Sequence, residues 1–64
     1  MQPHQQRVVE EKAELDDRAH KLSLFFRTEV FEGLPTVEKD RLRVQVHLMR
    51  AYSAVLEARI NAFA

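Results

Sequence analysis

The sequence predicts an all-α fold, an antiparallel two-helix hairpin whose copies assemble into a homo-oligomeric helical bundle. Three observations lead to this prediction. The single glycine, Gly33, and the second proline, Pro35, separate two long segments that contain no helix breaker. Apolar residues in both segments recur at three- and four-residue spacing, which is typical of amphipathic helices. A chain of 64 residues without cysteine builds only a small core, so association is the expected source of further stability.

One helical-hairpin domain is expected over residues 1–64, with a first helix at about 4–31, a loop at 32–36 and a second helix at about 37–62. Pro3 is suited to opening the first helix, because proline is favoured in a first turn. Gly33 is expected in the left-handed conformation that often ends a helix, and Pro35 prevents its continuation. Thr36 is expected to cap the second helix. The loop is short enough to force the two helices antiparallel.

One apolar stripe on each helix is expected to form the seam of the hairpin, where the two helices pack together. In the second helix, a seven-residue repeat defines this stripe. The predicted seam residues are Val8, Leu15, Ala19, Leu22, Phe26 and Val30 in the first helix, and Leu42, Val46, Met49, Leu56, Ile60 and Phe63 in the second.

A second apolar stripe, on roughly the opposite side of each helix, is expected to mediate self-association. A lone hairpin buries only one face per helix, so this stripe would otherwise lie in water. The predicted interface residues are Val9, Ala13 and Leu24 in the first helix, and Val44, Leu48, Ala51, Val55, Ala58 and Ala62 in the second. Phe31 continues the stripe of the first helix, and His20 interrupts it. The alternative is that the alanines reflect helix propensity alone.

A polar ladder of Gln45, Tyr52 and Arg59 lies between the two apolar faces of the second helix, at seven-residue spacing. An amide, a phenol and a guanidinium on one line could read a base edge, stack on a base and hold a phosphate. Arg7, with Lys12 as a helper, is a further candidate for holding phosphate. These five residues are the candidate ligand-binding residues. The alternative is structural, with Tyr52 packed at the seam, Gln45 setting the register and Arg59 paired with an acid.

The composition argues against several classes of function. A net charge of zero argues against a protein that coats nucleic acid or a membrane surface. The three histidines are too scattered for a metal site, and the sequence has no glycine-rich phosphate loop and no spacing typical of a catalytic triad. We therefore expect no catalytic residue, no metal and no cofactor. The first residues lack the apolar region of a signal peptide, and no apolar run approaches the roughly 18 residues of a membrane span, so the expected location is the cytoplasm.

Residues in both halves of the chain resemble a known family. They are Gln6-Arg7-Val8-Val9, Glu11-Lys12, Glu14-Leu15-Asp16, Lys21-Leu22 and Phe25-Phe26, then Phe31, Leu34-Pro35, Glu38, Arg41-Leu42, Gln45, Met49, Tyr52-Ser53, Leu56 and Arg59-Ile60. This pattern covers nearly the whole chain and resembles very short phage and prophage proteins related to a crAss-like phage protein. The architecture is also similar to the hairpin-type sponges that counter the CBASS and Thoeris defences. Those sponges are small helical oligomers that hold cyclic nucleotide signals in pockets between protomers.

The resemblance implies a phage-encoded sponge in the cytoplasm of a bacterial host. It would sequester a nucleotide-type immune signal, a cyclic oligonucleotide or a cyclic ADP-ribose isomer, between protomers without cleaving it. A first alternative is a helical binding module or scaffold whose second stripe docks on a host or phage protein. A second alternative is a four-helix dimer that binds structured RNA through the arginines of the second helix. None of these hypotheses is an enzyme.

Overall fold

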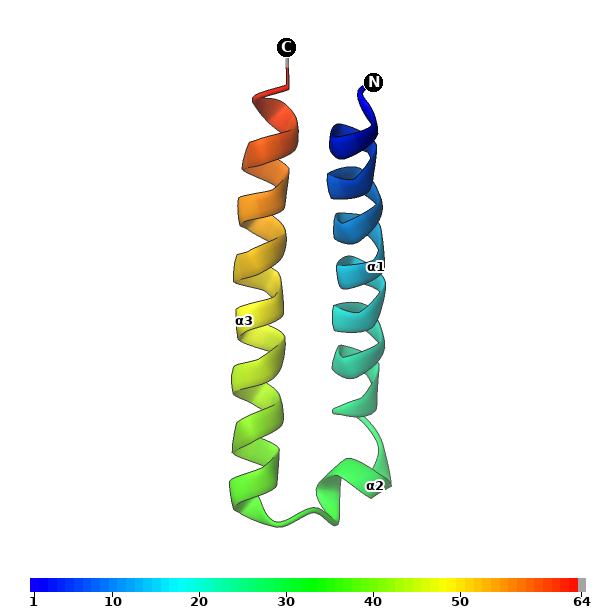
Figure 1. Cartoon of the computed structure of the whole chain (residues 1–64). Coiled ribbons are helices and arrows are strands. Elements are labelled where there is room, and N and C mark those ends of the chain that lie inside the picture. The colour runs from blue at the N-terminus through cyan, green and yellow to red at the C-terminus, as the bar shows by residue number, and fades with distance from the viewer. Residues whose placement is uncertain (64) are drawn as a thin grey trace.

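The computed structural model describes residues 1–63, which form an antiparallel hairpin of two long helices (Figure 1). Helix α1 spans Pro3–Phe25, the short helix α2 spans Glu29–Glu32, and helix α3 spans Thr36–Asn61. The two long helices lie side by side, and α2 lies in the bend that joins them (Figure 1). The prediction of an all-α helical hairpin is confirmed. Within the described residues, no helix is both long and apolar enough to cross a membrane.

Helix α1 begins at Pro3, as expected for a residue that lacks an N–H group. The backbone of Gln2 just before it is extended, and its N–H group donates a hydrogen bond of 2.9 Å to the side-chain oxygen of Gln5. Gln5 of the first turn thus supplies a side-chain acceptor for the N–H group of the residue that precedes the helix.

The first helix ends earlier than the sequence predicts, at Phe25 instead of about residue 31. Beyond Phe25 the chain changes to tighter three-residue hydrogen bonds, with the Arg27 N–H donating to the Leu24 carbonyl at 3.1 Å. Thr28 then takes an extended backbone, and its hydroxyl oxygen accepts a hydrogen bond of 3.2 Å from the Phe31 N–H. The threonine thus caps a new helix instead of continuing the old one.

This break exchanges the predicted roles of Val30 and Phe31. Val30, predicted in the seam, is 66% exposed, whereas Phe31, predicted on the second apolar stripe of the first helix, is only 2% exposed. The expectation was wrong because it assumed that the helical phase runs unbroken through residues 26–28. The Phe31 ring packs on Phe25 and Phe26, with centroid distances of 5.9 and 4.8 Å.

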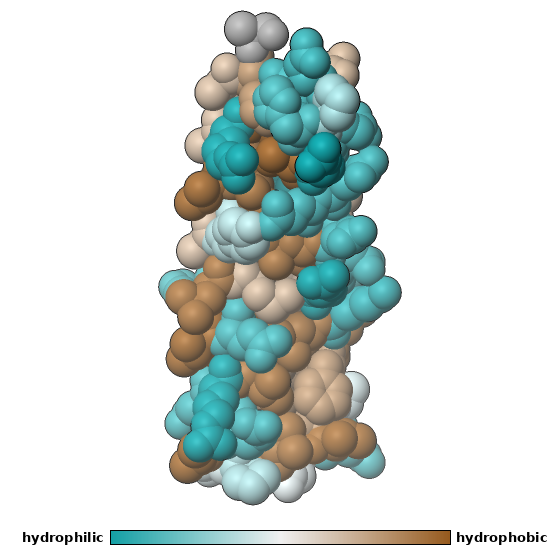
Figure 2. Space-filling view, in the orientation of Figure 1, coloured by the Kyte–Doolittle hydropathy of each residue, from teal (hydrophilic) through white to brown (hydrophobic). Residues whose placement is uncertain are grey.

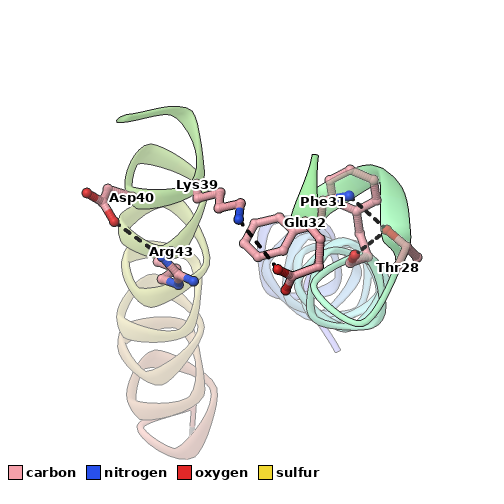
Figure 3. Close-up of polar contacts among 7 residues, drawn as sticks. Thr28, Phe31, Glu32, Lys39, Asp40 and Arg43 are labelled. Carbon is pink, nitrogen blue, oxygen red and sulfur yellow. Dashed lines mark hydrogen bonds and ion pairs between the residues drawn. The ribbon is translucent and has the colours of Figure 1, made fainter. Parts of the chain in front are cut away.

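Two cations of α3 lie over the Phe31 ring and hold the bend against the long helix (Figure 3). The ring centroid is 5.7 Å from Lys39 Nζ and 5.3 Å from the guanidinium carbon of Arg43. Lys39 also pairs with Glu32 at 3.5 Å, and Arg43 with Asp40 at 3.2 Å (Figure 3). Cation–π contacts of this kind are worth about 0.5–1 kcal/mol each at exposed sites.

The turn before α3 also differs from the expectation in its local geometry. Gly33 has a φ of −79°, so the predicted left-handed glycine is wrong. A Cβ atom there would meet only ordinary contacts, 3.6 Å from backbone oxygens. Thr36 is the first residue of α3 and not its cap, because Pro35 occupies the capping position. The Pro35 carbonyl accepts the first helical hydrogen bond, from the Lys39 N–H at 3.0 Å.

The core lies along the seam between α1 and α3. Leu56 is completely buried, and Val8 and Leu15 of α1 pack with it. The other buried residues of the seam are Ala19 and Val46, and the partly buried ones are Leu22, Phe26, Leu42, Met49, Ile60 and Phe63. Apart from Val30, the predicted seam residues are therefore buried or partly buried.

Replacing Thr28 by alanine tests the cap that starts α2. Because the hydroxyl is the acceptor for the Phe31 N–H, its loss is expected to lower the free energy of unfolding by about 1 kcal/mol. Thr36→Ala is the matched control, since Thr36 is an exposed threonine at the first position of α3 and not its cap. This variant should change stability by less than about 0.5 kcal/mol. Urea denaturation followed by circular dichroism measures both. Equal losses in the two variants would contradict a capping role for Thr28.

Candidate functional site: a hollow on the Tyr52 flank

The buried seam divides the sides of the hairpin into two flanks. Glu11 and Lys12 are neighbours in α1, and their side chains point about 100° apart around the helix axis. Leu15, one turn further along, points between them, so Glu11 lies on one side of the seam and Lys12 on the other. Tyr52 and Ser53 are separated by Leu56 in the same way on α3. We call the side with Glu11 and Tyr52 the Tyr52 flank, and the side with Lys12 and Ser53 the Lys12 flank.

The Tyr52 flank gathers four of the five predicted ligand-binding residues. The Tyr52 hydroxyl donates a hydrogen bond to the Glu11 carboxylate, which fixes the phenol against α1. Arg59 lies close enough for its charge to act on the Tyr52 hydroxyl. Gln45 lies two turns before Tyr52 on the same line of α3, and Arg7 lies one turn before Glu11 on α1. All four predicted residues are exposed to solvent.

A hollow of about 450 Å³ opens on this flank. Its lining residues are Leu15 of α1 and Arg41, Val44, Gln45, Leu48, Met49 and Tyr52 of α3. A second hollow of about 380 Å³ adjoins it and shares Arg41 and Val44. The larger hollow therefore combines an apolar surface with a phenol, an amide and a guanidinium.

Arg41 is a functional candidate that lies outside the predicted polar ladder. It lines both hollows and lies four residues before Gln45, on the same side of α3. Its nearest acid is Glu38, at 3.7 Å, in an exposed pair that contributes little energy. The sequence contained a signal for Arg41. Val37, Arg41 and Val44 follow one another at spacings of four and three residues, so a charged residue stands between two apolar ones on the same helix face.

Lys12 lies apart from the other four candidates, on the Lys12 flank. Its Nζ atom is 2.7 Å from Asp16 Oδ2 and 3.5 Å from Glu57 Oε2 of α3. The hydrogen bond from Lys12, followed by one from the Ser53 hydroxyl, lowers the pKa of Asp16. The stabilisation from this group is therefore present at neutral pH and is lost as the pH falls through the lowered pKa.

The Lys12 flank carries most of the polar links between the helices. Besides the Lys12 and Ser53 contacts, Arg50 donates a hydrogen bond of 2.6 Å to the Ser23 hydroxyl. That hydroxyl donates in turn to the Ala19 carbonyl at 3.0 Å. These links fix the register of α3 against α1, which leaves the arginines, the amide and the hollow of the Tyr52 flank available for other contacts.

The predicted self-association residues remain on the surface of the single chain. Exposed fractions are 57% for Val44, 62% for Leu48 and 56% for Val55. Leu24 is 48% exposed, Ala13, Ala51, Ala58 and Ala62 are also exposed, and Val9 is partly buried. We call Val44, Leu48, Ala51, Val55, Ala58 and Ala62 the outer stripe. Figure 2 shows apolar surface reaching the outside of the molecule on the α3 side.

Replacing Glu11 by glutamine is expected to lower the pKa of Tyr52. The hydrogen bond to Glu11, followed by desolvation, raises the pKa of this phenol above its ordinary value, and a neutral amide removes the largest cause. Since the folded protein holds the phenolic proton more tightly, this stabilisation is lost as the pH rises through the raised pKa. Tyr52 is the sole tyrosine and the chain has no tryptophan, so an ultraviolet titration reports this group alone. An unchanged titration curve in Glu11→Gln, with Glu14→Gln as control, would contradict the contact.

The comparisons with known proteins give one family. The family model described as Sequestin matches residues 2–62 of this chain. No curated protein and no solved structure gives a significant match. The expected relation to proteins of a crAss-like phage stays a prediction. Since the matched region includes both long helices and the bend in full, the chain belongs to the Sequestin family.

Proposed function

We propose that this protein is a phage-encoded sponge, a homo-oligomer that sequesters a nucleotide-type immune signal in the cytoplasm of a bacterial host. The signal is a cyclic oligonucleotide or a cyclic ADP-ribose isomer, held between protomers and not cleaved. Membership of the Sequestin family suggests a sequestering or binding role. The nucleotide, the host and the oligomer are the parts that this proposal adds.

The hollow on the Tyr52 flank is the observation that carries the proposal. Its volume of about 450 Å³ lies within the range of about 300–1,000 Å³ that is common for small-molecule sites. Tyr52 and Met49 offer surfaces on which a base could stack, and the Gln45 amide can donate to and accept from a base edge. Arg41 in the lining supplies a guanidinium group for phosphate. Arg59 is not in the lining and offers a second guanidinium group two turns beyond Tyr52 on α3. These are the groups that a nucleotide needs.

The hollow is open, and the outer stripe explains how it could be closed. Val44 and Leu48 belong both to the stripe and to the lining of the hollow. A second copy that covers the stripe would therefore add a second wall to the hollow. This supports binding between protomers over binding to a single chain.

The side chains of the hollow favour binding over chemistry. Tyr52 is the one hydroxyl in the lining, and its pKa is raised, chiefly by the hydrogen bond to Glu11. The phenol therefore stays protonated near neutral pH, where it is a poor nucleophile. The guanidinium of Arg41 and the amide of Gln45 orient and neutralise a ligand without reacting with it.

Native mass spectrometry of the protein, alone and with a pool of cyclic oligonucleotides and cyclic ADP-ribose isomers, tests the proposal. We expect a defined oligomer that gains the unchanged mass of one pool member in integer steps. Tyr52→Ala should abolish the gain, whereas Ala54→Ser, on the other side of α3, should keep it. An oligomer that gains no mass from any pool member would overturn the nucleotide proposal.

The exposed outer stripe also favours a second candidate function, docking on a host or phage protein. Exposed valine and leucine side chains on one line of a helix are the anchors of helix-in-groove recognition. This candidate expects a monomer or a dimer in sedimentation velocity and one stoichiometric partner captured from a host lysate. A capture that Leu48→Lys abolishes and Tyr52→Ala leaves intact would favour docking over the sponge.

A further inference from the structure

One line of exposed residues along α3 has a symmetric spacing: the order of its steps is the same from either end of the helix. The line runs through Val37, Arg41, Val44, Leu48, Ala51, Val55, Ala58 and Ala62, with steps that alternate between four and three residues. The centre of this line lies between Leu48 and Ala51. In an antiparallel pair of α3 helices, every residue of the line would therefore face a residue of the line in the second copy.

The sizes of these residues fit the antiparallel pair. Leu48 would face Ala51 of the second copy, and Val44 would face Val55. Val37 would face Ala62, and Arg41 would face Ala58. Each long side chain thus meets an alanine, and two valines meet each other. A parallel pair would place leucine on leucine and alanine on alanine, which crowds one half and leaves gaps in the other.

The largest area that this contact can bury reaches that of a stable pair. From Val37 to Ala62 the helix rises about 38 Å, and half of its surface over that length is about 600 Å² at a diameter of about 10 Å. With that whole half covered, two copies would together bury up to about 1,200 Å², which is at the lower end of stable, specific interfaces. Three of the anchoring side chains, Val37, Val44 and Leu48, are 57–62% exposed in the single chain and gain most from burial.

The antiparallel pair also brings an arginine of one copy to the hollow of the other. A two-fold axis between two antiparallel helices places the Tyr52 flanks of both copies on the same side. With the axis between Leu48 and Ala51, residue 59 of the second copy lies level with residue 40 of the first. Along the helix axis, Arg59 of the second copy is therefore at nearly the same height as Arg41 of the first copy, less than two residues away. It lies beside the hollow that Arg41 lines.

The geometry points to a ligand site that is shared between two copies. The anionic group of the ligand, a phosphate, binds between Arg41 of one copy and Arg59 of the second copy, and each pair holds two such sites. Ala58 of the second copy, facing Arg41, leaves room for that group. Two guanidinium groups this close repel each other unless an anion lies between them. This inference rests on the proposed function and adds the pairing of the copies and the residue that the second copy supplies.

Single cysteines test the pairing, since the natural chain has none. In an antiparallel pair, Val44→Cys alone and Val55→Cys alone give no disulfide, because identical positions lie about 16 Å apart along the axis. A mixture of the two variants should form a covalent dimer on oxidation, whereas Val44→Cys mixed with Ala54→Cys should not. Both residues are more than half exposed, so the hairpin should stay folded. Covalent dimers from each variant alone would overturn the antiparallel pair.

Native mass spectrometry with inorganic pyrophosphate as the probe tests the shared site. We expect two pyrophosphates per wild-type dimer and none on dimers of Arg41→Ala or of Arg59→Gln. When the Arg41→Ala and Arg59→Gln proteins are mixed, a heterodimer of one copy of each has a mass of its own. This heterodimer should carry one pyrophosphate, because one of its two sites keeps both arginines. A heterodimer that binds none would overturn the shared site, as would a wild-type dimer that binds none. If pyrophosphate binds as expected while no pool nucleotide does, the shared anion site stands and the nucleotide proposal fails.

Discussion

Replacing Leu56 by alanine is expected to unfold most of the hairpin. Leu56 is 0% exposed, and it is the residue on which Val8 and Leu15 of α1 converge. A buried leucine replaced by alanine costs about 2–5 kcal/mol. Small domains have free energies of unfolding near the lower end of about 5–15 kcal/mol, so one such loss approaches the whole stability. Circular dichroism at 25 °C should show most of the helical signal lost.

Val30→Ala is the control for this experiment. Val30 is an aliphatic residue in the same chain but is 66% exposed, so its truncation should change the free energy of unfolding by less than about 0.5 kcal/mol. A Leu56→Ala protein that melts within a few degrees of the wild type would mean that the core does not depend on the seam described above.

Replacing Leu48 by lysine is expected to abolish the proposed self-association while leaving the hairpin folded. Leu48 belongs to the outer stripe, lies next to the centre of the line from Val37 to Ala62 and is 62% exposed, so a lysine is readily accommodated in the single chain. In a pair of copies, the same ammonium group would have to leave water at the centre of an apolar contact. We expect the dissociation constant to rise at least about 100-fold, which corresponds to a little under 3 kcal/mol. Sedimentation velocity over a range of concentrations measures the change.

His47→Lys is the matched control, because His47 is the preceding residue of α3, is exposed and lies beside the stripe instead of on it. This variant gains the same positive charge at nearly the same place. It should sediment as the wild type does. Equal dissociation in both variants would attribute the effect to net charge and not to the stripe.

The hairpin was predictable because two strong signals agree. The apolar period is sustained over both long segments, and the segment from Gly33 to Pro35 interrupts it once. The seam could be read from the same period, since a helix of known phase fixes which residues share a face. The end of α1 was not predictable from breakers, because no glycine or proline lies between Pro3 and Gly33. There, a local side-chain cap competes with helix continuation, and its gain depends on burial of Phe31.

The candidate site was predictable along α3 but not across the two helices. Residues at seven-residue spacing stay on one line of a helix, so Gln45, Tyr52 and Arg59 necessarily lie on the same flank. Lys12 differs, because the side of α1 that it occupies depends on where α3 packs. Leu15 packs in the core of the seam, and this contact fixes which way α1 faces α3. As a result, Lys12 and Glu11 lie on opposite sides of the seam. Arg41 was missed because it belongs to the apolar line and not to the polar ladder.

The start of α1 and the end of α3 lie at the same end of the hairpin, away from the bend (Figure 1). In an antiparallel pair of α3 helices, the open end of one copy lies beside the bend of the other. Affinity tags or fluorescent proteins fused to the N-terminus would therefore project from opposite poles of the pair. A genetic fusion of two copies into one polypeptide has to connect these poles. The hairpin is 47 Å long, so the connecting linker needs at least about 14 residues in an extended conformation.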